Sequence, residues 1–135
     1  MTEKEEKKKK LRGFAKIIAE NLDPLNEKEK FAKKFKDIDL RILLNANDGR
    51  YAALIKIKNG TLEVDGIKNK PKENLSKENV NWDGYLGTST QTFFDIAMGN
   101  ISTLGMIWKI ITRKIKIKKI KNVLILTELF SILEQ

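Results

Sequence analysis

Residues 40–65, which read LRILLNANDGRYAALIKIKNGTLEVD, carry the clearest structural pattern in this sequence. Apolar and polar residues alternate here in three runs, and a period of two indicates half-buried β-strands. The apolar positions are Leu40, Ile42 and Leu44, then Ala53, Ile55 and Ile57, and finally Leu62 and Val64. Asp48-Gly49 and Asn59-Gly60 separate the runs, and these dipeptides are the strongest short-range hairpin signals. The stretch therefore predicts a three-stranded antiparallel meander.

The residues before the meander predict two helices behind a frayed, charged lead-in at residues 1–10. The first helix has one apolar face, made of Leu11, Phe14, Ala15, Ile18 and Leu22. For the second helix, either Asp23 is the N-cap with Pro24 at the first helical position, or Asn26 is the cap and Glu29 completes a capping box. In both cases its inward stripe is Phe31, Ala32 and Phe35.

After the meander, residues 68–81 are polar and contain Pro71, which favours a loop. A short fourth strand is expected at Val80, Trp82 and Tyr85, closed by Gly84 and Gly87. Residues 88–90, Thr-Ser-Thr, open a short helix that carries Phe93, Phe94, Ile96 and Ala97 and ends at Gly99. Ser102 caps another short helix, with Leu104, Ile107, Trp108 and Ile111 on one face.

The C-terminal part predicts one more strand and one more helix. Ile115 and Ile117 alternate with lysines, as expected for a fifth strand. A final helix starts at Asn122 and contains Leu126, Leu129, Phe130 and Leu133. Its first half, residues 123–126, is apolar on nearly all sides, which predicts burial on more than one side.

The composition limits the chemistry that the chain can perform. Its 135 residues suit a single domain, 1–135. Cysteine is absent, which excludes disulfides, thiolate nucleophiles and Cys-bound zinc. Histidine is absent too, which removes the usual general base and the commonest metal ligand. We therefore expect a protein that is not an enzyme and holds neither a metal nor a cofactor.

Residues that could still suggest catalysis have simpler explanations. The candidate acids Asp65, Asp83 and Asp95 are not paired at a spacing that suits acid–base work, and Asp83 in Trp-Asp-Gly suits a turn or a helix cap. The hydroxyls at residues 88–90 have no histidine to activate them, and helix capping accounts for them. An enzyme is the third-ranked hypothesis.

No targeting or membrane signal is evident. The first ten residues carry no apolar stretch before a cleavage site, so no signal peptide is predicted. No apolar run reaches the roughly 18 residues that a membrane span needs. The last residues, Ile-Leu-Glu-Gln, differ from the peroxisomal Ser-Lys-Leu signal. We expect a soluble cytoplasmic protein, and the sequence does not indicate its oligomeric state.

The net charge of +9 includes a basic stretch, Lys109–Lys121, that contains no acid. Its candidates for binding an anionic membrane, a CoA moiety or nucleic acid are Arg113, Lys114, Lys116, Lys118 and Lys119. Each lysine near an anionic lipid surface contributes about 1 kcal/mol, which suits transient docking. The other interpretation is a solvated face whose lysines keep an edge strand from mispairing. No aromatic residue lies within the stretch to stack on bases, so nucleic-acid binding ranks second among the functions.

From about Phe31 to Leu133, the order of elements and several marker residues resemble the sterol carrier protein type 2 (SCP-2) domain family. The matching segments are Trp82-Asp83-Gly84-Tyr85, Phe93-Phe94-Asp95-Ile96-Ala97-Met98-Gly99, Ser102 to Ile111, Lys114-Ile115-Lys116-Ile117-Lys118, and the helix from Asn122. Two positions depart from the family pattern, because Arg113 replaces a glycine before the last strand and Lys119-Ile120 replaces Gly-Asp after it.

The resemblance implies an α+β fold with a five-stranded, mainly antiparallel, twisted sheet whose helices pack on one face and enclose an apolar tunnel. It also implies non-enzymatic binding or transfer of a fatty acyl, isoprenoid or sterol-like lipid. The two short helices of residues 93–108 suit a lid, and their methionines suit an adaptable lining. The residues expected to contact the lipid are Phe93, Phe94, Ile96, Met98, Met106, Trp108, Leu126 and Phe130. The alternative reading of these residues is an ordinary hydrophobic core.

Overall fold

The computed structural model describes residues 11–97 and 115–133, with only the backbone at residues 96 and 97. Helix α2, Gly13–Leu22, is the first element. Its buried residues are Phe14, Ala15, Ile18, Ala19 and Leu22, which recur at helical spacing on one side. This is the apolar face that the sequence predicts.

The predicted meander is confirmed. Strands β1 (Asp39–Ala46), β2 (Tyr51–Lys58) and β3 (Thr61–Lys68) pair antiparallel in order. At the second hairpin Asn59 has φ 51° and Gly60 has φ 77°, so both central turn residues are left-handed. This geometry is the type I′ turn that Asn-Gly favours, and its twist matches that of the flanking strands.

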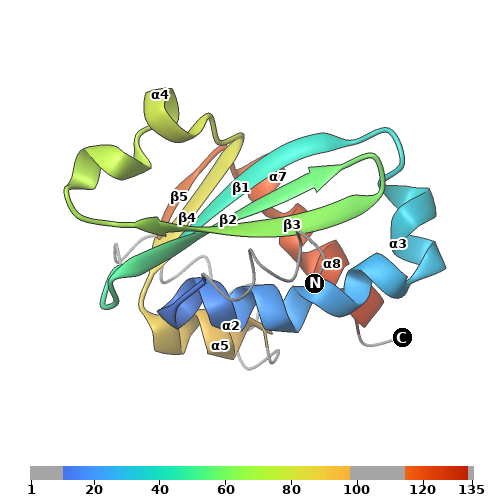
Figure 1. Ribbon diagram of the computed structural model, residues 1–135, viewed down its shortest axis with the longest axis horizontal. Helices are drawn as coiled ribbons and strands as arrows, with labels where there is room; N and C mark the ends of the chain where they lie inside the picture. The colour runs from blue at the N-terminus through green and yellow to red at the C-terminus, as the bar shows by residue number, and fades with distance from the viewer. Residues whose placement is uncertain (1–10, 98–114, 134–135) are drawn as a thin grey trace.

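Two more strands complete a five-stranded sheet with the order β3-β2-β1-β4-β5 (Figure 1). Strand β4, Gly84–Thr88, pairs parallel with β1, and β5, Lys116–Lys118, pairs antiparallel with β4 at the sheet edge. Three of the four pairings are antiparallel, so the sheet is mixed but mainly antiparallel, as expected. The fourth strand begins at Gly84, later than predicted, and Val80 and Trp82 precede it.

The longer helices lie together on one face of the sheet, called here the helix face (Figure 1). They are α2, α5 (Thr90–Ala97) and α8 (Ile125–Leu133), accompanied by the short elements η1 (Asp23–Glu27), α3 (Glu29–Lys34) and α7 (Ile120–Val123). The side chains of this face and of the helices form the main apolar core, which includes Phe14, Phe31, Ile42, Ile55 and Leu129. The predicted packing of helices on one face is therefore confirmed for these elements.

Neither predicted cap of the second helix is correct. Helix α3 starts after Lys28, which makes no side-chain capping bond, and η1 starts at Asp23 without one. The Asn26 side chain instead reaches β3, where its Oδ1 accepts the Leu62 N–H at 2.7 Å and its Nδ2 donates to the Leu62 carbonyl at 2.9 Å. Asn26 thereby pairs with the outer edge of β3 as a neighbouring strand would.

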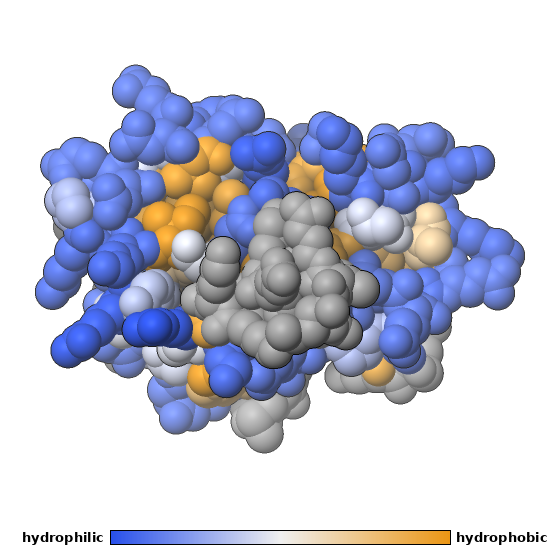
Figure 2. Space-filling model, in the orientation of Figure 1, coloured by the Kyte–Doolittle hydropathy of each residue, from blue (hydrophilic) through white to orange (hydrophobic). Residues whose placement is uncertain are grey.

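The opposite face of the sheet, called here the back face, is covered in part by residues 72–82. The sequence predicts a loop over residues 68–81, yet this segment contains η2 (Lys72–Leu75) and α4 (Lys77–Val80), the latter capped by Ser76. Their apolar side chains meet those of β1 and β2 in a second, smaller cluster of Leu43, Ala52, Leu54, Leu75, Val80 and Trp82. Figure 2 shows a hydrophobic area where this segment meets the sheet.

The C-terminal helix is divided, which the sequence did not predict. Helix α7 ends at Val123, and α8 begins at Ile125, while Asn122 lies inside α7 and donates to the Asp83 carbonyl at 2.7 Å. The expectation that residues 123–126 are buried on several sides is wrong, because Leu124 is 49% exposed. Leu124 lies between the two helices and is exposed, whereas Val123 and Leu126 are buried.

Candidate functional site

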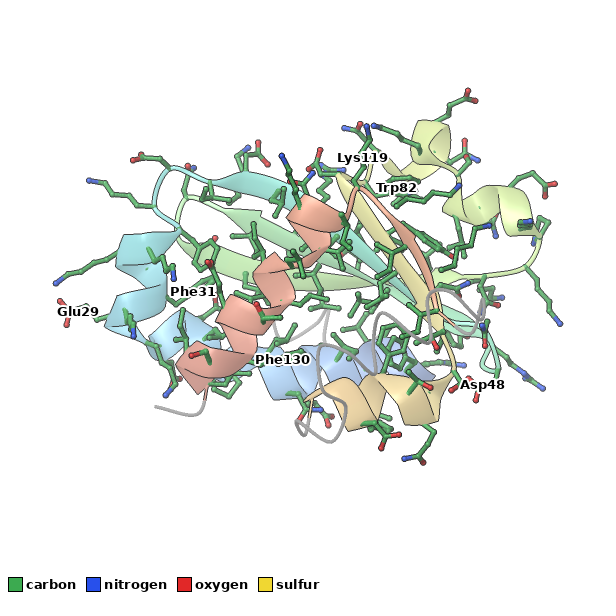
Figure 3. The ribbon with its side chains drawn as sticks, turned by 180° about the vertical axis from the view of Figure 1, so that it is seen from behind. Glu29, Phe31, Asp48, Trp82, Lys119 and Phe130 are labelled. Atoms are coloured by element: carbon green, nitrogen blue, oxygen red, sulfur yellow. The ribbon has the colours of Figure 1, made fainter. Side chains whose placement is uncertain are left out.

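Four of the predicted lipid contacts have described side chains, and all four lie on the helix face. Phe93 of α5 is 6% exposed and packs against Phe14 of α2, with ring centroids 4.9 Å apart. Leu126 of α8 is buried in the main core. Phe94 and Phe130 are half-buried, and Phe130 packs against the same core (Figure 3). The apolar layer between the sheet and the helices therefore contains Phe93 and Leu126 inside it and Phe130 at its boundary.

The other predicted lipid contacts lie outside the described side chains. They are Ile96, Met98, Met106 and Trp108, together with the expected helix cap at Gly99 and the helix of residues 102–111. Their roles remain predictions.

The predicted basic residues are described in part. Lys116 and Lys118 are exposed on β5, an edge strand, and Lys119 is exposed at the turn that follows, with φ 57°. Arg113 and Lys114 lie outside the described residues. The register pairs Lys118 with Tyr85 and Lys116 with Gly87, so both strand lysines lie on the back face.

This pairing brings aromatic rings to the basic strand, which sequence reasoning missed. Trp82 and Tyr85 have ring centroids 5.8 Å apart, and the Nζ of Lys118 lies 6.0 Å from the Trp82 ring centroid. The Nζ of Lys77, from α4, lies 5.6 Å from the same centroid. The signal in the sequence is weak, because more than thirty positions separate Trp82 from Lys118 and only the register of β4 with β5 joins them.

The aromatic rings and lysines line a concave region of about 580 Å³, called here the back-face groove. It lies between the segment of residues 69–77 and strands β1, β4 and β5, and its lining includes Asn45, Asn69, Lys72, Lys77, Trp82, Tyr85, Lys116 and Lys118. Figure 3 shows Trp82 between the η2–α4 segment and the sheet, away from Phe130 and the helix face. The groove and the main apolar core thus occupy opposite sides of the sheet.

The three candidate acids have structural partners. Asp65 forms an ion pair with Lys56 at 2.6 Å, and Asp95 accepts a bond from a side-chain amide one turn earlier on α5. Asp83 accepts the Arg41 N–H at 2.8 Å and its own N–H bonds to the Arg41 carbonyl. Asp83, at a bend just before β4, therefore joins the start of β4 to β1; of the two expected roles, a turn suits this position and a helix cap does not.

The hydroxyl cluster at residues 88–90 caps α5, as predicted. The Ser89 Oγ accepts the Thr92 N–H at 3.2 Å, the standard N-cap bond. Thr90 donates from both its N–H and its hydroxyl to Asp48 Oδ1, at 2.9 and 2.8 Å. These two bonds hold the pKa of Asp48 below its ordinary value, and they tie the first hairpin to the start of α5.

Neither a cluster of metal-binding acidic side chains nor a membrane-spanning helix is found among the described residues. In residues 11–97 and 115–133 no three acidic side chains gather in a way that could hold a metal ion. Within the same residues no helix is long and apolar enough to cross a membrane.

The sequence matches no family model and, at a significant level, no curated protein. Solved structures do resemble it. The UbiJ-SCP2 ubiquinone synthesis protein aligns with TM-score 0.59 and 8% identity over 92% of this chain and 97% of its own. Sterol carrier protein 2 from Yarrowia lipolytica, in its apo form, aligns with TM-score 0.56 and 22% identity over 93% and 94%. The inverting sec-alkylsulfatase Pisa1 from Pseudomonas aligns with TM-score 0.55 and 18% identity over 88% of this chain but 15% of the enzyme.

Proposed function

We propose that this chain, which has an SCP-2-like fold, binds and transfers a long-chain apolar molecule and performs no chemistry on it. The observation that carries the proposal is the likeness to two SCP-2 structures over more than nine-tenths of both partners' length. A fold hosts more than one function, and the sulfatase likeness shows that this one also occurs inside an enzyme. The absence of His and Cys from this sequence supports the carrier role over a catalytic one.

The proposed ligand site is an apolar tunnel between the sheet and the helices. A site for a lipid tail needs apolar lining beyond what the core requires, with a few polar groups at its mouth. The proposed lining is Phe93, Phe94, Ile96, Met98, Met106, Trp108, Leu126 and Phe130. The half-buried side chain of Phe130 supports this assignment, because it packs against the main core and is still partly exposed.

The ligand class follows from the apolar lining: a fatty acyl, an isoprenoid or a sterol-like molecule. Transfer also requires contact with a membrane, and we assign this contact to Arg113, Lys114, Lys116, Lys118 and Lys119, which would dock transiently on an anionic surface. A cytoplasmic location fits this role.

The test is native mass spectrometry of protein purified from a heterologous host, followed by organic extraction. We expect a fatty acid or phospholipid bound near one per chain, and uptake of oleate or of an isoprenoid by the delipidated protein. Phe94→Arg introduces a charge at a half-buried position of α5 that belongs to the proposed lining, and it should abolish uptake, because an unpaired charge is costly to bury. Phe130→Arg repeats the test from α8 in case the first variant folds poorly.

The matched control is Leu124→Arg, which adds the same charge on an aliphatic side chain that is 49% exposed. It should retain ligand at the wild-type stoichiometry. A delipidated wild-type protein that takes up neither ligand on titration would sink the carrier function. Equal uptake by the wild type and both phenylalanine variants would instead show that the ligand lies elsewhere.

A further inference from the structure

The back-face groove has the chemistry of a ligand site of its own, although two of its lysines, Lys116 and Lys118, also belong to the proposed membrane contact. Its volume of about 580 Å³ lies within the range of roughly 300–1,000 Å³ that small-molecule pockets occupy. It combines aromatic rings, amide side chains and lysines in one concavity. These are the groups that recognise a flat, polar and negatively charged molecule.

The charge around the groove is strongly positive. Lys72, Lys77, Lys116 and Lys118 line it, against one acid, Glu73. None of the four lysines forms an ion pair with a carboxylate among the described residues. Two of their ammonium groups, from α4 and from β5, lie within 6.0 Å of the same Trp82 ring centroid. An anion between them would be attracted by both, whereas without one the two charges repel each other.

The aromatic wall has a fixed orientation. A Cβ on Gly87 would lie 2.8 Å from the Tyr85 Oη and 3.0 Å from its Cε1, so the ring lies across position 87 because that residue is glycine. The Tyr85 hydroxyl accepts a bond from Asn45 Nδ2 at 3.1 Å, and Asn45 Oδ1 accepts one from Asn69 Nδ2 at 3.2 Å. A ring held in this way loses little freedom when a ligand stacks on it.

The floor beneath this wall is also rigid. Trp82 is 6% exposed, and its Nε1–H donates to the Leu75 carbonyl at 3.0 Å. Its ring therefore stays between the sheet and the η2–α4 segment, while its neighbour Tyr85 is half-buried and offers more of its surface. The groove thus pairs an aromatic platform with a positive rim.

We propose that the back-face groove binds a mononucleotide, with the base on the accessible part of Tyr85, against which the buried Trp82 packs, and the phosphates among Lys77, Lys116 and Lys118. A purely anionic ligand would need the lysines but not the oriented ring, and a purely aromatic ligand would need the ring but not the lysines. A nucleotide uses both. This site is separate from the proposed apolar tunnel because it lies on the other face of the sheet, and it shares only Lys116 and Lys118 with the proposed membrane contact.

The experiment measures binding to the full chain by isothermal titration calorimetry with three probes: ATP, inorganic tripolyphosphate and adenosine. ATP should bind at one per chain and more tightly than either part alone. The double variant K77Q/K118Q should weaken ATP binding about tenfold, the sum of two exposed charge interactions. Its matched control is K16Q/K36Q, which removes the same charge from two exposed lysines outside the groove lining and should change the affinity less than about twofold.

A third variant, Y85L, tests the base platform. It should reduce ATP binding to the level of tripolyphosphate and leave tripolyphosphate binding unchanged. Equal affinities for ATP and tripolyphosphate in the wild type would overturn the proposal, as would equal losses in K77Q/K118Q and K16Q/K36Q. An oligothymidylate that binds through the same lysines where ATP does not would replace the mononucleotide with single-stranded nucleic acid.

Discussion

The contact between Asn26 and Leu62 predicts a measurable loss of stability when it is removed. Strand β3 is an edge of the sheet, and the outer N–H and carbonyl of Leu62 are both bonded by the Asn26 side chain, at 2.7 and 2.9 Å. Asn26→Ala deletes both bonds at once. A net contribution of about 0.5–1.5 kcal/mol for each bond gives roughly 1–3 kcal/mol. Because Asn26 is half-buried and water can reach part of the exposed edge, we expect about 1–2 kcal/mol.

The assay is urea unfolding followed by circular dichroism, with a thermal scan beside it. A loss of 1–2 kcal/mol should lower Tm by about 4–8 °C in a chain of this size. Asn26→Asp should be at least as damaging, because its carboxylate would face the Leu62 carbonyl and lies near Asp23. The slope of the urea transition should not change, since the same surface is exposed on unfolding.

The matched control is Asn21→Ala on α2. The Asn21 side chain is exposed and bonds within its own helix, to the Ile17 carbonyl at 2.9 Å. Alanine is the better helix former, so this variant should be neutral or slightly stabilising, within about 0.5 kcal/mol. If N26A loses no more stability than N21A, the bonds to Leu62 do not hold the β3 edge and the reasoning fails.

Two further predictions concern turns. Gly60→Ala should lower the free energy of unfolding by at least about 2 kcal/mol, because φ at this position is +77° and the new Cβ would lie 2.7 Å from the Ala32 carbonyl oxygen. A decrease of less than about 0.5 kcal/mol, measured by urea unfolding, would contradict this prediction. Asp48 accepts two hydrogen bonds from Thr90, so an NMR titration should give its carboxyl a pKa below the ordinary value of 3.8. The contribution of these bonds to stability should be complete above pH 3.8 and should disappear as the pH falls through the lower pKa of the folded state. The variant D48N should lack this part of the acid sensitivity, and an Asp48 pKa at or above 3.8 would refute the role of Thr90.

The parts of the fold that the sequence predicted depend on local signals. The alternation of apolar and polar residues in residues 40–65 and the Asn59-Gly60 turn are both patterns of a few neighbouring residues. Together they predicted the meander and the antiparallel pairing of its strands. The Thr-Ser-Thr cluster gave the start of α5 in the same way. Residues 68–81 have weak periodicity and many polar side chains, and their two short helical turns are stabilised by contacts with the sheet that no local pattern encodes.

The sequence nevertheless contains a signal for the second, smaller apolar cluster, which lies on the back face of the sheet. Within the meander, Leu43 and Leu54 occupy positions that the alternation assigns to the solvent face, yet both are apolar. In the structure they are 0% and 4% exposed, covered by Leu75, Val80 and Trp82. Apolar residues at both parities of a strand predict burial on both faces. Leu43 and Leu54 therefore indicate that another part of the chain covers the back of the sheet, but they do not indicate which part.

The alternation of side chains along a strand also separates the proposed lipid tunnel from the back-face groove. On β5, Ile117 pairs with Leu86 and packs against the main core, while Lys116 and Lys118 on either side of it project to the back-face groove. Because successive side chains of a strand point to opposite faces, one short segment contributes to both layers without placing a charge in the core. The glutamine substitution at Lys118 therefore changes the groove and leaves the apolar layer intact. A substitution at Phe94 changes α5 and not the groove lining, so lipid uptake and nucleotide binding can each fail while the other stands.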